Sequence, residues 1–432
     1  MAILAIILFI SIFLLILYGF PVAFTLGGIS TIYALLFLDS ADFSMLPLRI
    51  MGTMTNYVLL AVPLFVYMGI MLEKSGLAES LLETMAMLFG KMKGGLAISV
   101  VVVGALLAAS TGIVGATVIT MGLISLPTML NRGYSPELAT GTIAASGTLG
   151  QIIPPSVVLV LLGDMLGVTV GDLFKAALLP GVLLVGCYIV YIAIYAARNP
   201  EAAPSIPEEE IKAFRENDFW KKIFQAFLLP FVLIVAVLGS ILAGKATPTE
   251  AAAIGAMGAT LLTIMQGRFN LKILNSVMRE TTHLTTMVFI ILLGATTFTF
   301  VFRELGGDTY LVDLIKSSNL SPNVFLALVM LVVFVAGFFI DFIEIIFIIV
   351  PVVAPVFEVY DMNLIWIGIL LALNLQTSFL SPPFGFSLFY LKGVAPPEIT
   401  TGHLYRGIIP FVLIQVVFLI LVILFPKLVF LI

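Results

Sequence analysis

The stretch GTLGQIIPPS, residues 147–156, lies inside an apolar segment that is otherwise typical of a membrane helix. It contains two glycines, a glutamine and two consecutive prolines. Glycine weakens a helix, and proline removes a backbone donor and clashes with the preceding turn. We therefore predict that the helix over 135–166 is broken at Pro154-Pro155, and that this break has a function in the protein.

A second stretch of the same kind, QTSFLSPPFG, occupies residues 376–385. Each break is preceded by a glycine-led apolar segment, GALLAASTGIVGATV in the first half and GFFIDFIEIIFIIVP in the second. Each is followed, at similar spacing, by a further proline within an apolar segment. The matching landmarks are Gly104, Pro155 and Pro180 in the first half, and Gly337, Pro383 and Pro410 in the second. This order and spacing indicate a repeat.

The composition places the chain in a lipid bilayer. Of its 432 residues, 61% are hydrophobic and 10% are charged, whereas soluble domains carry about 25% charged residues. We expect an all-α polytopic membrane protein without a soluble domain or a nucleic-acid partner. The predicted helices cover 2–19, 20–38, 53–73, 95–109, 113–130, 135–166, 172–197, 223–243, 248–266, 283–303, 322–340, 342–359, 363–392 and 404–425, with amphipathic pieces at 77–90 and 309–318.

Lysine and arginine fall unevenly on the two faces that these helices define. If the pairs at 95–130 and 322–359 each return to the side they start from, 14 basic residues lie on one face and 6 on the other. The richer face, which includes the hydrophilic linker 198–222, is then cytoplasmic, and both termini are periplasmic. The two repeats start from opposite faces, and such inverted repeats are typical of secondary transporters.

The pairs at 95–130 and 322–359 are too long for one span and have polar residues at their turns. Each holds about 36 residues, or about 54 Å of helix, against a bilayer core of about 30 Å. Two arrangements stay open at this point: a tight pair of full spans, or a re-entrant hairpin that ends in a cavity.

The breaks offer oxygen ligands for an alkali cation, because the carbonyls before a proline lose their helical donors. At the first break we predict a sodium site, and at the second break its twin. The first comprises the carbonyls of Gly150 and Ile153 with the hydroxyls of Ser110 and Thr111; the second comprises Thr377, Ser378 and Ser381 facing Gly337 and Asp341.

The half-helix after each break presents unpaired N–H groups and a positive dipole end, which favour an anion. We therefore expect a small organic carboxylate between the two breaks. The predicted substrate contacts are Gln151, Ser156, Asn374, Gln376 and Glu344. Gln151 and Asn374 have an alternative role, which is to satisfy backbone groups freed at the breaks.

Asp341 and Glu344 are carboxylates deep in an apolar run, where an ionisable group indicates function. If the helix is continuous there, the two share one face. We expect an ion or gating role for Asp341, and the alternative is a group that is protonated or faces water at the hairpin mouth. His283 and His403 fall at predicted helix starts, where a capping or interface role is expected.

These segments, together with GYSPELATGTIAASGTLGQIIPPS and NLQTSFLSPPFGFSLFYLKGVAPPEITTGHLYRGIIPF, give the chain a resemblance to a known family. It resembles, over nearly its whole length, the large membrane subunit of tripartite ATP-independent periplasmic (TRAP) transporters, particularly the mannitol/chloroaromatic-type branch. The resemblance implies a sodium-driven elevator transporter in a bacterial or archaeal inner membrane. It also implies re-entrant hairpins, a separate small four-helix membrane subunit and a soluble periplasmic binding protein that delivers organic acids.

The family's motifs are carried over only where they match. They add Gly112, Pro155 and Pro383 to the two sodium sites, while the family's first hairpin serines are missing and Glu344 departs from the usual pattern. The implied division is a transport domain over 94–170 and 321–400, with scaffold helices over 1–93, 171–320 and 401–432.

Three other functions compete with a tripartite permease. A stand-alone sodium-coupled anion symporter of related fold would need no binding protein. An intramembrane aspartyl protease needs two carboxylates from separate helices, whereas Asp341 and Glu344 lie on one element, so we expect no enzyme. A passive channel subunit needs no inverted pair of broken helices.

Overall fold

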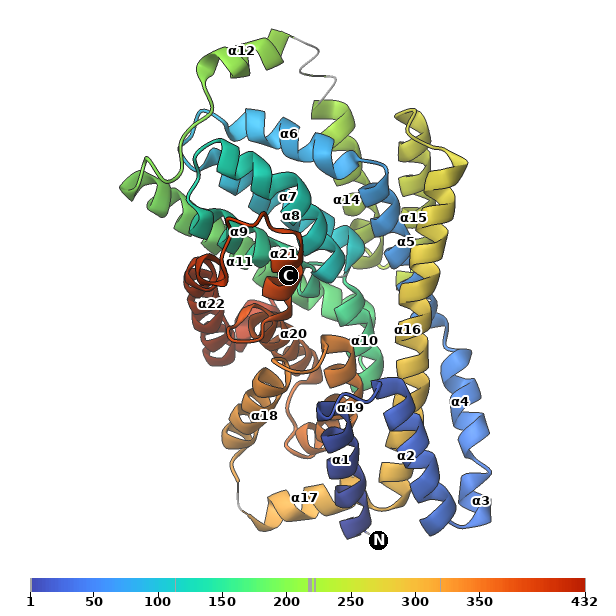
Figure 1. The fold of residues 1–432 in the computed structure, drawn as a ribbon. Coiled ribbons are helices and arrows are strands. Elements are labelled where there is room, and N and C mark those ends of the chain that lie inside the picture. Colours follow the sequence, from blue (N-terminus) through green and yellow to red (C-terminus); the bar gives the residue numbers. More distant parts are fainter. Residues whose placement is uncertain (1, 113, 217–219, 221–222, 319, 432) are drawn as a thin grey trace.

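The computed structural model describes residues 2–112, 114–216, 220, 223–318 and 320–431, and all regular secondary structure in them is helical (Figure 1). This confirms the predicted fold class. Most predicted helices begin and end within a few residues of their observed bounds, because apolar length and the proline and cap residues at their ends set them locally.

One group of helices, here called the hairpin body, consists of two similar units. The first contains α7 (Gly95–Thr111), α8 (Val114–Asn131), α9 (Pro136–Thr148), η2 (Leu149–Gln151), α10 (Val157–Leu166) and α11 (Val170–Arg198); the second contains α18 (Pro322–Ala336), α19 (Phe342–Val359), α20 (Leu364–Leu380), α21 (Phe386–Val394) and α22 (Thr401–Leu424). The units interlock, since α9 packs on α22 and α21 packs on α8. Both predicted helix breaks are present.

The remaining helices form a second group around the long helix α16 (Leu271–Glu304), here called the frame. Its other members are α2 (Val22–Phe37), α4 (Leu46–Met54), α5 (Ala61–Lys74), α14 (Leu229–Leu242) and α15 (Pro248–Met265). Where α2 crosses α16, a Cβ on Gly294 would lie 2.6 Å from the carbonyl oxygen of Ala23. Only glycine permits this approach.

Shorter elements connect and flank the two groups. They are α1 (Ala2–Leu17), α3 (Ser40–Phe43), η1 (Tyr57–Leu60), α6 (Leu77–Phe89), α12 (Glu208–Glu216), η3 (Ile223–Leu228), α17 (Gly307–Ser317) and η4 (Pro426–Val429). The amphipathic pieces predicted at 77–90 and 309–318 correspond to α6 and α17. Helices α3, α4 and α12 are short or polar and were not predicted.

The two helical hairpins, α7–α8 and α18–α19, start from opposite ends of the molecule, near α12 and α17 respectively (Figure 1). The base of the first is fastened to the linker, because the N–H groups of Gly94 and Ser135 donate to the carbonyls of Ala203 and Ala202, both at 2.9 Å. The base of the second is closed by the Tyr360 hydroxyl, which donates to the Leu320 carbonyl at 2.6 Å. The repeats are therefore inverted.

Helices α11 and α22 pack against the rest of the hairpin body. Helix α22 lies against α9 and α20, and α11 lies against α7, α10 and α20. The resemblance implied that both helices belong to the scaffold. Which helices move together stays a prediction.

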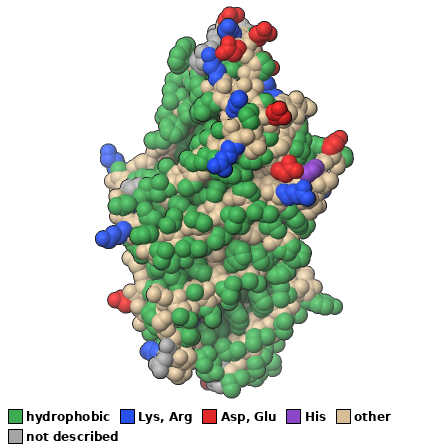
Figure 2. All heavy atoms as spheres, turned by 90° about the vertical axis from the view of Figure 1, so that its left-hand side faces the viewer, with side chains coloured by type: hydrophobic (Ala, Val, Ile, Leu, Met, Phe, Trp, Pro, Cys, Tyr) green, Lys and Arg blue, Asp and Glu red, His purple; other side chains and the backbone are tan. Residues whose placement is uncertain are grey.

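The surface suits a bilayer. Seven helices in the described residues are long and apolar enough to cross a membrane. Large apolar side chains face outward on them and on their neighbours, for example Phe24, which is 70% exposed, and Val417, which is 57% exposed. Figure 2 shows a broad apolar band on one face, with most charged side chains gathered toward the end that carries α12. The chain is a multi-pass membrane protein.

The predictions for His283 and His403 fare differently in the structure. His403 is at the third position of α22 and forms a capping box with Thr400, as expected for a cap. The prediction for His283 is wrong, because α16 begins at Leu271 and places His283 inside the helix. The first turns of α16 are polar, so a search for apolar length starts the helix too late.

Candidate ion and substrate site

The tip of the first hairpin lies against the first break. Gly112 ends α7 in a left-handed conformation (φ 62°), and a Cβ there would lie 2.9 Å from the Val157 nitrogen at the start of α10. A Cβ on Gly150 would lie 2.6 Å from the Ala108 carbonyl oxygen. The break contains a cis Pro154-Pro155 peptide bond. The tip therefore reaches halfway along the broken helix, as in a re-entrant hairpin.

The first break exposes the predicted carbonyls. No hydrogen bond in the described part of the chain ends on the Gly150 or Ile153 carbonyl oxygen. The Ser156 hydroxyl spans the break and donates to the Gln151 carbonyl at 3.1 Å. The side chains of Ser110 and Thr111 lie outside the described residues. Within the described residues, the Gly150 and Ile153 carbonyls therefore accept no hydrogen bond, and a sodium site at this break, including its hydroxyl half, stays a prediction.

The second hairpin meets the second break in the same manner. A Cβ on Gly337 would lie 2.1 Å from the Ser378 hydroxyl oxygen. The hydroxyls of Thr377, Ser378 and Ser381 each donate to a carbonyl three or four residues back, at 2.7 to 2.8 Å. Their lone pairs are left for a cation. Pro382-Pro383 is cis, and the Pro383 carbonyl accepts from the Tyr405 hydroxyl at 2.7 Å.

Asp341 and Glu344 together cap helix α19. The Asp341 carboxylate accepts from the Phe342 N–H at 2.6 Å, and Glu344 accepts from the Asp341 N–H at 3.3 Å. Because the helix begins at Phe342, the two residues do not share one face of a continuous helix, so that condition of the sequence analysis is not met. The Asp341 side chain also accepts from the Glu344 N–H in this capping box, and it lines the cavity described next. Its part in a sodium site stays a prediction.

A cavity of about 350 Å³ lies between the hairpin tips and α16. Gly115 beside the first tip, Asp341 and Phe342 at the second, and Val157 at the N-terminus of α10 line it. The frame contributes Glu280 to Val288, the half of α16 nearest its start. The volume is within the range of small-molecule sites, about 300–1,000 Å³.

The five predicted substrate contacts are not among the residues that line this cavity. Gln151, Ser156 and Gln376 are fully buried, and Asn374 donates to the Met330 carbonyl at 2.7 Å, which joins α20 to the second hairpin. The Glu344 carboxylate accepts a hydrogen bond in the N-terminal cap of α19. Of the two half-helix N-termini, the one that lines the cavity is that of α10.

Four side chains of this region were not predicted. Glu280 and Tyr390 line the cavity from α16 and from the half-helix after the second break. Nearby, the Thr120 hydroxyl of the first hairpin donates to the Glu73 carboxylate of α5, which joins the hairpin body to the frame. Tyr390 is seven residues beyond Pro383, so the predicted half-helix could have indicated it. The other three depend on contacts between distant segments.

Comparison with known proteins decides the family. The model for the DctM component of tripartite ATP-independent periplasmic transporters matches residues 9–428. The chain belongs to the DctM family. Similar proteins include the C4-dicarboxylate TRAP transporter large permease DctM of Pseudomonas aeruginosa, which is 31% identical over 400 residues, covering 92% of this chain and 91% of that protein. The mannitol/chloroaromatic branch within the DctM family stays a prediction.

Other members of the DctM family differ in what their names say they carry. The sialic acid large permease SiaM of Vibrio cholerae is 28% identical, covering 95% of this chain and 93% of that protein. The ectoine large permease TeaC of Halomonas elongata is also 28% identical, covering 96% of this chain and 95% of that protein. DctM-family proteins are transport permeases of tripartite systems in the inner membrane, so the enzyme alternative is excluded.

Solved structures support the fold. The YdaH transporter of Alcanivorax borkumensis superposes with a TM-score of 0.66 at 15% identity, covering 94% of this chain and 96% of that one. MtrF of Neisseria gonorrhoeae superposes with a TM-score of 0.62 at 12% identity, covering 90% of this chain and 85% of that one. At such low identity the likeness concerns architecture alone.

Proposed function

We propose that this chain is the permease of a sodium-coupled tripartite uptake system for small organic carboxylates. A small membrane subunit and a soluble binding protein would complete the system, and the hairpin body would move against the frame as in an elevator. The observation that carries the proposal is the matched contact of each hairpin tip with its own helix break, on either side of one cavity. Names of relatives in the family, which include C4-dicarboxylate and sialic acid permeases, support the substrate class.

The donor set fits sodium. Hard cations take oxygen ligands. The proposed sites offer the carbonyls of Gly150 and Ile153, which accept no hydrogen bond from the described residues, at one break, and three hydroxyls with the Asp341 carboxylate at the other. When bound, sodium would supply positive charge beside the cavity. The carboxylate of the substrate would then face this charge and the N-terminus of α10, which favours an anion.

Uptake in proteoliposomes tests the coupling. The chain is reconstituted with its small subunit and binding protein, and uptake of labelled succinate and pyruvate is measured at varied sodium concentration. Asp341→Asn keeps a good N-cap residue but removes the charge, and Ser381→Ala removes one hydroxyl ligand. We expect both to raise the sodium concentration for half-maximal uptake. Ser99→Ala is the matched control, since Ser99 is also buried and donates to a carbonyl four residues back at 2.9 Å.

Two results would count against the proposal. Unchanged sodium dependence in both variants would exclude the second sodium site as described. Full uptake without the binding protein would favour the stand-alone symporter. The motion is tested separately by a cysteine pair at Thr120 and Glu73 in a Cys187→Ser background. Cross-linking these positions should stop uptake, and reduction should restore it; uninterrupted uptake after complete cross-linking would exclude movement at this contact.

A further inference from the structure

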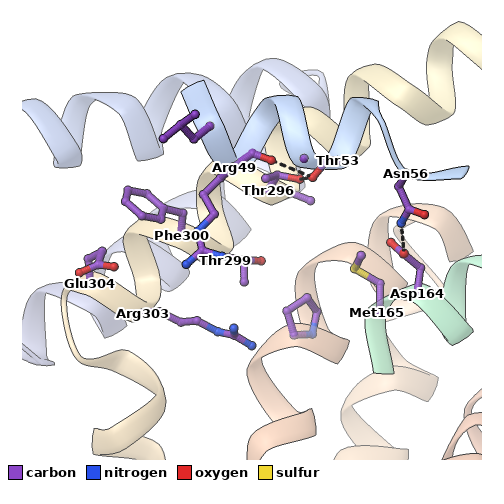
Figure 3. A pocket seen from close by; sticks show the side chains of 14 residues that line it. Arg49, Thr53, Asn56, Asp164, Met165, Thr296, Thr299, Phe300, Arg303 and Glu304 are labelled. Carbon is purple, nitrogen blue, oxygen red and sulfur yellow. Dashed lines mark hydrogen bonds between the residues drawn. The ribbon is translucent and has the colours of Figure 1, made fainter. Parts of the chain in front are cut away.

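A second cavity, of about 540 Å³, lies between the frame and the hairpin body, near the ends of α4, α10 and α16 (Figure 3). The polar groups of its lining include Arg49, Thr53, Asp164, Thr299 and Arg303. It is separate from the cavity at the hairpin tips, which uses the other half of α16. By the Lys and Arg count it is on the face predicted to be periplasmic.

Two guanidinium groups supply the positive charge of this cavity. Arg49 reaches down from α4 toward Thr299 and Phe300, and Arg303 extends from α16 into the open space (Figure 3). Among the described residues, neither has a carboxylate within 4.0 Å. By contrast, Arg132 pairs with Glu210 at 2.8 Å. The two charges therefore lack a protein counter-ion at bonding distance.

The cavity also has two carboxylates, and neither neutralises the arginines. Asp164 accepts a hydrogen bond from the Asn56 side chain at 2.6 Å and faces it. Glu304 points away from Arg303 in Figure 3. Neither carboxylate therefore occupies the guanidinium donors of Arg49 and Arg303.

We propose that this cavity binds a small carboxylate through Arg49 and Arg303, at a site outside the one between the hairpin tips. The planar guanidinium fork matches a carboxylate with two parallel hydrogen bonds, and the hydroxyls of Thr53 and Thr299 add donors on the same wall. The walls come from both groups of helices, α4 and α16 on one side and α10 and α19 on the other. Such a walled space suits a small molecule better than an acidic loop of a protein.

The charge at the site can be measured without knowing its ligand. A Thr299→Cys variant in a Cys187→Ser background is labelled with an anionic and a cationic methanethiosulfonate of similar size. Relative to an exposed cysteine, we expect the anionic reagent to be favoured about tenfold, since two guanidinium groups without a carboxylate at bonding distance raise the local concentration of an anion. Arg49→Gln with Arg303→Gln should abolish this preference, and Lys316→Gln, an exposed change on α17, should leave it intact.

Protection from labelling identifies the ligand class. Succinate, pyruvate and acetate are compared with chloride and phosphate at matched ionic strength. We expect carboxylates to slow the labelling of Thr299→Cys, and the two glutamine substitutions to remove this protection. Arg49→Lys with Arg303→Lys keeps the charge without the fork, so the reagent preference should persist while protection weakens. A Leu284→Cys variant at the hairpin-tip cavity should not respond to the arginine changes, which separates the two sites.

Four results would overturn the proposal. These are a lack of anionic preference at Thr299→Cys, equal protection by chloride and by carboxylates, protection that survives the loss of both arginines, and a reagent preference without protection by any small carboxylate. The last result would point instead to an acidic side chain of a protein partner. Because none of these measurements uses sodium or transport, failure here is distinguishable from failure of the proposed function.

Discussion

Replacing Gly337 by alanine tests the contact between the second hairpin and its broken helix. The added Cβ would lie 2.1 Å from the Ser378 hydroxyl oxygen and 2.7 Å from its Cβ, whereas unstrained carbon contacts are about 3.5–4.0 Å long. The hydroxyl can rotate, but the Ser378 Cβ moves only if the helices separate. Overpacking of this kind costs about 1–3 kcal/mol. We expect Gly337→Ala to lose that much free energy of unfolding.

A second substitution should reverse the loss. Ser378→Gly removes both clashing atoms, and the next atom near the new Cβ is the Val333 carbonyl oxygen at 3.4 Å. Alone, Ser378→Gly should cost about 0.5–1 kcal/mol for glycine within a helix, plus about 0.5–1.5 kcal/mol for the bond to the Leu375 carbonyl. The double variant should then be more stable than the sum of the single effects predicts, by about 1–3 kcal/mol.

Equilibrium unfolding of the purified protein in mixed detergent and SDS micelles measures these free energies. Gly186→Ala in α11 is the matched control, since no atom lies within 4 Å of its added Cβ, and replacing an unconstrained helical glycine by alanine gains about 0.5–1 kcal/mol. Additive single effects, within about 0.5 kcal/mol, would refute the contact. So would an equal loss in Gly186→Ala, because the effect would then not be specific to the hairpin tip.

Three further substitutions probe single hydrogen bonds. Asn56→Ala leaves Asp164 without its donor and should destabilise the contact between the frame and the hairpin body by about 1.5–3 kcal/mol. Fluorescent labels on the two groups of helices should then report faster exchange between their relative positions. Thr120→Val keeps the shape of the side chain but leaves both buried Glu73 oxygens without a donor, so it should cost about 1–3 kcal/mol, and an unchanged unfolding midpoint would exclude the bond. Tyr405→Phe removes the donor to the Pro383 carbonyl at the second break. We expect the free energy of unfolding to fall by about 0.5–1.5 kcal/mol, the value of one hydrogen bond, and a larger loss would contradict this single-bond role.

The helix breaks and hairpins were predictable because their causes are local. Proline acts on the turn before it wherever the chain runs, so GTLGQIIPPS and QTSFLSPPFG marked both breaks. The pattern Asp341-Phe342-Ile343-Glu344 also had a local cause, since an acidic or hydroxyl residue followed three places later by glutamate is a capping-box signature. Because carboxylates so deep in an apolar run usually indicate function, ion chemistry was predicted here and the cap was not.

The lining of the cavity was not predictable in the same way. Gln151 and Asn374 were chosen because they are close to a break in sequence, but side-chain direction at an irregular turn follows no helical period, and both side chains point into packed protein. Glu280 lies in α16, more than 40 residues before the second hairpin begins at Pro322. No periodicity in one segment encodes which turn of α16 faces that hairpin.

Helix α16 connects the two cavities, and this arrangement has a consequence for the proposed motion. Its first half, at Glu280 to Val288, faces the hairpin tips, and its second half, at Ala295 to Glu304, faces the arginine cavity. From Leu284 to Thr299 the helix rises about 22 Å at about 1.5 Å per residue. If the hairpin body moves along this helix toward α17, the tips leave Glu280 and approach the half that carries Arg303. The carboxylate site at Arg303 would then be adjacent to the hairpin tips at the periplasmic end of the movement, and the bonds Thr120–Glu73 and Asn56–Asp164 would both break during it.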